Sequence, residues 1–367
     1  MKKFFLLLWL LPPAASAQLI DDTATQQLIL KATDKIYNYE FDEIDPIVRQ
    51  VRAKYPNHPV LPVLKSLQLY WQYLPIKENR TAMNQYMNYL NQGVALSDKI
   101  LEKNENDPEG VFFSMASHGY LAMKYHYDNE NMKAVNEARK AYSYLKAGFK
   151  LMEKNPEFYF TTGLYNYYVE RYPMDHPIVK PVMIFFQDGD MPLGLKQMEI
   201  GAKRGIFTRT ETGLYLGQIY LKHESQFARG AALFRQLADK YPQNPVFNMH
   251  CAEGLVLAGR GSEALPYIAR LKEMPQKFLA LPVKVLEAMI QEKAGDLREA
   301  AENYQAAIRL PVNDVFTKEF SAHAYAGLAR QAARSGNRNQ AKTYYKKVLD
   351  LAEYKSTIRE ARNFLKS

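Results

Sequence analysis

One stretch near the C-terminus decides the fold: "AHAYAGLARQAARSGNRNQAKTYYKKVLDLAEYK", residues 322–355. Its eighth and twentieth places hold the small residues Ala329 and Ala341, and Gly336 marks a turn between them. Small residues at these places let two antiparallel helices approach closely, while larger residues such as Tyr345 fill the seam to the next pair. The stretch therefore predicts one helix–turn–helix unit of a repeat protein.

The same pattern recurs upstream, with Ala300 and Ala264 in the place of Ala341 at spacings of 41 and 36 residues. These units closely resemble the tetratricopeptide repeat (TPR). Earlier segments also pair as helices, and no run alternates with the period of a strand over any length. We therefore predict an all-α protein, a right-handed α-solenoid of about eight TPR-like antiparallel helix pairs.

Two repeats end in similar patterns, Tyr-Pro-Asn-His-Pro at residues 55–59 and Tyr-Pro-Gln-Asn-Pro at residues 241–245. We interpret both as helix stops, in which proline cannot continue the helix and asparagine tolerates a left-handed conformation. The repeats are regular from residue 209 onward and looser before it. We predict divergent pairs over residues 18–208, with an insertion at 173–187, and a regular array with a capping helix over residues 209–367.

Residues 1–17 have the three parts of a secretory signal peptide. Lys2 and Lys3 form a basic start, an uncharged apolar segment follows, and Ala15-Ser16-Ala17 supplies small residues for cleavage. The apolar segment is too short for a membrane anchor, which needs about 18 uninterrupted apolar residues. We expect cleavage after Ala17 and a periplasmic or secreted mature chain.

The composition is that of an ordered chain with a large core, because 47% of the residues are hydrophobic and 24% are charged. The formal charge is +9, and it falls to +7 once Lys2 and Lys3 are removed. The single cysteine, Cys251, cannot form an internal disulfide. Its place in a helical pattern predicts a small buried thiol without a reactive role.

Seven of the seventeen residues in "PEFYFTTGLYNYYVERY" (156–172) are aromatic. An inward stripe of a helix is about 100° wide and cannot hold all seven. Four residues that recur at helical spacing are assigned to the buried seam between helices: Phe160, Leu164, Tyr167 and Tyr168. Tyr165 and Tyr172, seven residues apart, lie together on another side and either pack against a neighbouring repeat or the insertion, or bind a partner.

The proline-rich insertion "PMDHPIVKPVMIFFQ" (173–187) delays the second helix of this repeat until about Leu193. Long ordered insertions in compact domains are usually functional or cover something. We expect Ile184, Phe185 and Phe186 to be buried against the aromatic helices, since an exposed apolar run is an aggregation hazard. The alternatives are a mobile lid or docking patch, and a loop that touches a membrane, although five apolar residues without a flanking basic cluster bind bilayers weakly.

The chain carries none of the residue groupings of common catalytic sites. Its histidines include no His-x-x-x-His pair, and it has no Gly-x-Ser-x-Gly elbow or phosphate-binding glycine loop. Asp188-Gly189-Asp190 lacks the further oxygens of a calcium loop and is interpreted as a turn and helix cap. We predict a protein that is not an enzyme and that uses no cofactor or metal.

Much of the positive charge lies at the C-terminus, where residues 338–367 carry eight basic and three acidic side chains. A polar terminal face keeps a solenoid soluble. Nucleic acid is not an expected partner of an exported chain, whereas an anionic envelope surface or an acidic protein fits this charge.

The TPR resemblance implies protein or peptide binding on the concave face. We therefore predict a non-catalytic exported scaffold that binds a protein or peptide segment in its concave groove; the sequence makes no prediction of oligomeric state. The alternative is a carrier for an apolar small molecule, held in an aromatic-lined groove under the insertion. The candidate partner-binding residues are Tyr159, Tyr165, Asn166, Tyr172, Phe185 and Phe186.

Overall fold

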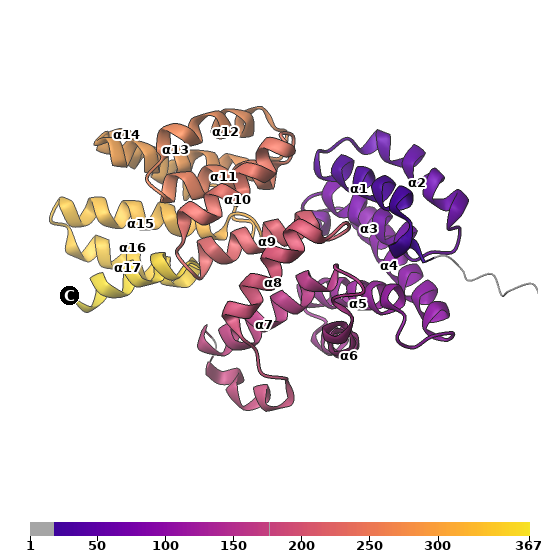
Figure 1. Ribbon diagram of the computed structural model, residues 1–367. Helices are drawn as coiled ribbons and strands as arrows, with labels where there is room; N and C mark the ends of the chain where they lie inside the picture. The colour runs from indigo at the N-terminus through magenta and orange to yellow at the C-terminus, as the bar shows by residue number, and fades with distance from the viewer. Residues whose placement is uncertain (1–17, 176) are drawn as a thin grey trace, which may run out of the picture. The chain divides into compact units, whose positions relative to one another are not determined.

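The computed structural model describes residues 18–175 and 177–367, and within them every regular element is a helix (Figure 1). The predicted signal peptide, residues 1–17, lies outside this range. The described chain forms eight consecutive helix pairs followed by a single helix, so the predicted array of about eight pairs is confirmed. The pairs are α1 (Thr23–Tyr37) and α2 (Ile44–Lys54), α3 (Val60–Gln72) and α4 (Arg80–Leu101), α5 (Pro108–Tyr127) and α6 (Asn131–Leu151), α7 (Phe158–Asp175) and α8 (Met191–Arg204), α9 (Arg209–Lys222) and α10 (Phe227–Lys240), α11 (Pro245–Leu257) and α12 (Gly261–Glu273), α13 (Ala280–Ala294) and α14 (Leu297–Ala307), and α15 (Lys318–Arg334) and α16 (Arg338–Leu351), before α17 (Lys355–Lys366).

Short 3-10 helices lie in several connections: η1 (Leu19–Asp21), η2 (Phe41–Glu43), η3 (Ile76–Glu78), η4 (Pro177–Phe185) and η5 (Lys277–Leu279). The chain divides into two compact units. Of the described residues, the first unit holds 18–33 and 42–155, and the second holds 34–41 and the residues from 156 to 367. The sequence placed the change from divergent to regular repeats later in the chain, at residue 208.

Small residues make the close helix contacts of the second unit, as the repeat pattern predicts. Ala264, Ala300 and Ala341 have no exposed surface, because each faces a neighbouring helix. The large residues of the same pattern fill the space between helices, with Tyr304 fully buried and Tyr345 only 3% exposed. Burial of an aromatic side chain of this size contributes about 2 to 3 kcal/mol to stability.

The asparagines of the repeat-ending patterns act differently from the prediction. Asn244 has an extended backbone, with φ −81° and ψ 116°, and its side chain caps the next helix. Its Oδ1 accepts hydrogen bonds from the backbone N–H groups of Val246 at 3.0 Å and Phe247 at 3.1 Å. Pro245 follows at the first helical position, where its missing N–H costs nothing. The prediction of a left-handed asparagine is therefore wrong for Asn244, which starts α11.

The second unit also includes the end of α1 and the turn after it, residues 34–41. Tyr37 is fully buried, and its ring centroid lies 5.7 Å from that of Tyr241 and 6.0 Å from that of Phe247. The Asn244 side chain donates a 2.9 Å hydrogen bond to the Tyr37 carbonyl across a separation of 207 residues. Repeat periodicity cannot reveal such a contact, because it reports only neighbouring repeats.

Candidate partner-binding site

The aromatic stretch lies on α7, which divides its rings between the core and the surface. The buried rings are Phe158, Tyr159, Phe160 and Tyr167. Tyr165 and Tyr168 are partly buried, and Tyr172 is 50% exposed. The assignment to the buried seam is confirmed for Phe160 and Tyr167, whereas Leu164 and Tyr168 are only partly buried and pack against the same buried cluster. Tyr172 is the ring of this stretch that reaches furthest into solvent.

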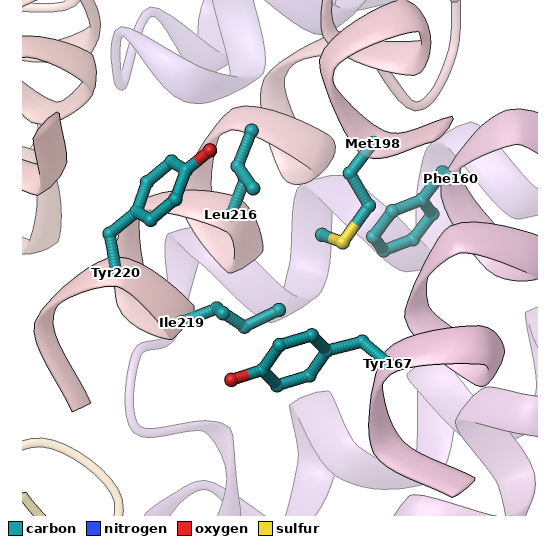
Figure 2. Close-up of a cluster of buried hydrophobic side chains, with 6 residues drawn as sticks. All are labelled: Phe160, Tyr167, Met198, Leu216, Ile219 and Tyr220. Carbon is teal, nitrogen blue, oxygen red and sulfur yellow. The ribbon is translucent and has the colours of Figure 1, made fainter. Parts of the chain in front are cut away.

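α7 crosses α8 at two facing glycines. A Cβ on Gly163 would lie 2.8 Å from the Gly194 carbonyl oxygen, and a Cβ on Gly194 would lie 2.7 Å from the Gly163 carbonyl oxygen. Beside this crossing lies an apolar cluster that joins α7, α8 and α9. Figure 2 shows its members: Phe160, Tyr167, Met198, Leu216, Ile219 and Tyr220. The close crossing and the cluster hold α7 firmly, because well-packed interiors yield little.

Polar contacts hold the second half of α7. The Tyr167 hydroxyl donates to Glu224 Oε1 at 2.5 Å, and burial together with this carboxylate raises the pKa of Tyr167 well above its usual value. The His223 ring packs edge-on against Tyr168, with the centroids 5.6 Å apart. Burial, with a contribution from the Arg171 guanidinium, lowers the pKa of His223 to about 4. The imidazole is therefore neutral at pH 7 and packs as an aromatic ring.

The base of the insertion is anchored at its return to α8. The Tyr165 hydroxyl donates a 2.7 Å hydrogen bond to the Gln187 carbonyl oxygen. The Met191 backbone N–H donates to Glu170 Oε2 at 3.1 Å. Asp190 Oδ1 accepts from the Leu193 N–H at 2.8 Å and so caps α8. The interpretation of residues 188–190 as a helix cap is confirmed by Asp190, but the predicted turn is absent, since these residues form no turn and Asp190 has an extended backbone.

The middle of the insertion is exposed. Ile178, Ile184 and Phe185, which we call the apolar tip, are 89%, 79% and 76% exposed, and Phe186 is 37% exposed. The expectation that Ile184, Phe185 and Phe186 are buried is therefore wrong. After α7 the chain forms the 3-10 helix η4 instead of returning directly to α8, and in this conformation Ile178, Ile184 and Phe185 stay exposed to solvent. The apolar tip accordingly does not roof a closed pocket of the kind that a carrier needs.

Two of the six candidate residues are buried within the second unit. Tyr159 is 7% exposed, and the Arg204 guanidinium lies 5.5 Å from its ring centroid. Asn166 is 5% exposed, and its Nδ2 donates to Gln197 Oε1 at 2.8 Å. Both side chains serve internal packing. Tyr165 is engaged at the base of the insertion, so the surface candidates are Tyr172, Phe185 and Phe186.

Sequence reasoning missed two exposed apolar residues beside these candidates. Ile178 belongs to the apolar tip, and Met174, at the end of α7, is 57% exposed. The signal that would have found Ile178 is Pro177, since proline does not continue an α-helix and Ile178 therefore lies outside α7. Met174 lies within α7, and no such signal marks it in the sequence.

The second unit shows no sign of a reactive centre around Cys251. The thiol is free and buried, and burial raises its pKa to about 12, so it is protonated and inert at pH 7. Among the described residues, no three His, Cys, Asp or Glu side chains cluster in a way that would hold a metal ion. In the same part of the chain, every helix is too short or too polar to cross a bilayer.

No family model matches the chain, and no curated protein is similar to it. Solved structures that resemble it include the human IFIT1 dimer with m7Gppp-AAAA, at 13% identity over 94% of this chain and 85% of that chain, with a TM-score of 0.45. Yeast Tom70 has 16% identity over 84% of this chain, with a TM-score of 0.41, and this chain spans 63% of its length. A tetratricopeptide repeat protein from Parabacteroides merdae has 14% identity over 82% of this chain and 98% of that chain, with a TM-score of 0.33. Likeness at this level concerns the arrangement of helices, and the function must be argued from the chain's own residues.

Proposed function

We propose that the protein is a non-catalytic, exported binding scaffold that holds a protein or peptide partner through the apolar tip of its insertion. One observation carries the proposal: three large apolar side chains, each at least 76% exposed, project from a segment whose base is held by hydrogen bonds. Soluble proteins rarely display such side chains together unless they bind something.

The rigid support beneath the tip favours a binding role. Binding loses affinity when a flexible segment has to be ordered, so a pre-anchored segment keeps more of its contact energy. The close crossing of α7 and α8 provides this support. Phe186 directly follows the tip in the chain and is 37% exposed, and Tyr172 on α7 is 50% exposed. Both could add aromatic contact area, and aromatic residues are enriched among the strongest contacts of interfaces.

The charge and the apolar character of the tip indicate what kind of partner it binds. Lys180 is exposed among the apolar residues, whereas Asp175 at the end of α7 is already paired with Arg171 at 2.8 Å. The surface around the tip therefore carries only a weak positive charge. We expect a partner with a shallow apolar pocket or groove that receives Phe185 and Ile184. Because apolar burial drives the contact, its affinity should depend little on salt.

The basis for export is the signal peptide predicted for residues 1–17. Fractionation of cells that express the tagged full-length chain tests this part of the proposal. A processed protein that begins at Gln18 in the periplasm or medium is expected. An unprocessed protein in the cytoplasm would contradict it.

The binding role is tested with the variant Ile184→Ser/Phe185→Ser in the mature chain. Crosslinking and mass spectrometry with the unaltered protein in an envelope extract identify the partner, and titration calorimetry then measures its affinity for each form. Removing two anchors of this kind should weaken binding by about 100-fold, since each accounts for about 1 to 2 kcal/mol. The melting temperature should hardly change, because both side chains are exposed.

The matched control is Leu265→Ser/Val312→Ser, which removes two exposed apolar side chains from elsewhere in the same unit, 51% and 43% exposed. This control should bind as the unaltered protein does. If the tip variant keeps full affinity for the crosslinked partner, the apolar tip is not the binding surface. A large fall in the melting temperature of the tip variant would show that the tip is a packing element.

A further inference from the structure

The last helix, α17, carries a row of exposed cations. Lys355, Arg359, Arg362 and Lys366 are all exposed. With 100° of turn per residue, the four lie within an arc of about 60°, and they span about 16 Å along the helix. They therefore form one straight row, which we call the basic stripe.

The side of α17 opposite the basic stripe packs against the rest of the protein, so the stripe itself faces solvent. Ala361 has no exposed surface, and the ring centroid of Phe364 lies 4.8 Å from that of Tyr345 on α16. The carboxylate of this helix, Glu360, is occupied by Arg330 at 2.9 Å and by the Tyr345 hydroxyl at 3.0 Å. The stripe is thus turned to solvent, and within the described chain none of its four side chains forms an ion pair.

A terminal face that serves only solubility would mix positive and negative side chains. α14 shows this arrangement, with Arg298 facing Glu302 and with Glu299 nearby. The arc of α17 has no acidic member, although like charges in one row repel each other. Repulsion of this kind is relieved when an anionic partner covers the stripe.

The arc of α17 that carries the basic stripe holds neither aromatic nor apolar side chains, and this indicates which class of anionic partner the stripe binds. No aromatic residue lies within it, whereas proteins that bind single-stranded nucleic acid use stacking rings. No apolar anchor lies within it either, whereas protein interfaces depend on such anchors at their centre. A straight row of cations without anchors is suited to a flat array of phosphate groups.

We propose that the basic stripe of α17 docks the protein on an anionic phospholipid bilayer. The attraction is electrostatic, since the apolar side of α17 is buried against α16 and does not enter the lipid. This surface is separate in residues and in chemistry from the apolar tip, so the proposal stands independently of the proposed function.

The test is co-sedimentation of the mature chain, residues 18–367, with vesicles of phosphatidylcholine alone and of phosphatidylcholine mixed with phosphatidylglycerol. Binding to the mixed vesicles is expected, with loss at high salt. Each basic residue near an anionic surface strengthens binding roughly five-fold. The variant Lys355→Gln/Arg359→Gln/Arg362→Gln/Lys366→Gln should therefore lose affinity by on the order of several hundred-fold.

The matched control is Lys277→Gln/Lys293→Gln/Arg298→Gln/Arg309→Gln, which removes four exposed charges from the same unit. This control should still bind the mixed vesicles nearly as well as the unaltered protein. That result would show that binding depends on the basic stripe and not on the net charge of the protein. The milder variant Arg359→Gln/Arg362→Gln should show about a 25-fold loss and serves if the quadruple variant is unstable. Equal binding to both vesicle types, equal loss in the control, or capture of a soluble polyanion without vesicle binding would each overturn the proposal.

Discussion

Gly163 and Gly194 set how closely α7 approaches α8 beneath the insertion. Backbone atoms, which cannot rotate away, occupy the space that a methyl group on either residue would need. Helix propensity alone favours alanine over glycine by about 1 kcal/mol. At this crossing we expect the steric effect to outweigh the propensity, because overpacking of a rigid contact costs about 1 to 3 kcal/mol.

Replacing Gly163 by Ala should lower the free energy of unfolding by about 1 to 2 kcal/mol, as measured by urea denaturation. The matched control is Gly119→Ala in the interior of α5, where a Cβ meets nothing within 4 Å. This control should be neutral or stabilising by up to about 1 kcal/mol. Equal effects of the two substitutions would contradict the steric account of the crossing.

At the scale of elements, a buried carboxylate joins the start of one first helix to the start of the next. Glu157 lies just before α7, and its Oε1 accepts from the N–H groups of Ile206 at 2.7 Å and Phe207 at 3.0 Å. Its Oε2 accepts from the N–H of Thr208 at 2.8 Å, at the N-cap of α9. Glu319 near the start of α15 has the same role for α17, accepting from the Tyr354 N–H at 3.0 Å. The carboxylates therefore set the spacing between successive repeats.

Glu157→Ala should destabilise the protein by about 3 kcal/mol, because it leaves buried backbone donors without an acceptor. Glu157→Gln should cost less, since the amide retains one acceptor oxygen. Glu302→Ala is the control, because Glu302 is 69% exposed and its contact with Arg298 is 3.7 Å long. Thermal unfolding checks all three, and a Glu157→Ala protein as stable as the control would refute the role of this carboxylate.

Across the whole molecule, buried charges of the second unit link repeats that are far apart in sequence. Glu253 on α11 has no exposed surface and accepts from His250 Nδ1 at 2.8 Å. Its other oxygen lies 3.7 Å from His323 Nε2 on α15, which is 3.8 Å from Glu319. Burial by itself raises the pKa of Glu253, but the two imidazoles outweigh this effect and hold the pKa at about 2. The pKa of His323 is raised by the two carboxylates despite burial, with Arg330 opposing.

These shifts predict how stability depends on pH. Because the pKa of Glu253 is lower in the folded state than its unfolded value of 4.5, its ionised form stabilises the fold above pH 4.5. This stabilisation is lost as the pH falls from 4.5 towards 2. The raised pKa of His323 has the opposite pH dependence. Its contribution to stability is complete below pH 6.5 and is lost as the pH rises through its folded-state pKa. Urea denaturation between pH 2.5 and 5 should show a loss of on the order of 3 kcal/mol on acidification, because Glu253 is protonated in this range.

The variant Glu253→Gln is the control for this prediction. Glutamine keeps an acceptor for His250 but cannot ionise, so the variant should be less stable at pH 5 and should lose less stability below pH 4.5. An unchanged acid profile in this variant would assign the pH dependence to other carboxylates.

The sequence by itself determined the helices and their pairing. The repeat spacing, the small residues at Ala264, Ala300 and Ala341, and the polar caps are local signals, since each acts within one helix or between adjacent helices. The burial of Phe160 and Tyr167 followed from the same periodicity. Such local signals could not predict two other features: the boundary between the two units at residue 155, and the packing of Tyr37 against Tyr241. Both depend on contacts between segments that are far apart in the chain.

Only the tertiary structure decided which aromatic and apolar residues reach the surface. A proline-rich insertion has no periodicity, so its composition showed that residues 182–186 were apolar but not which way the chain turned. The 3-10 helix η4 exposes Ile178, Ile184 and Phe185, whereas the crossing of α7 and α8 buries Tyr159 and Asn166. Exposure is a property of the packed neighbours as much as of the residue, and the neighbours are set by folding in three dimensions.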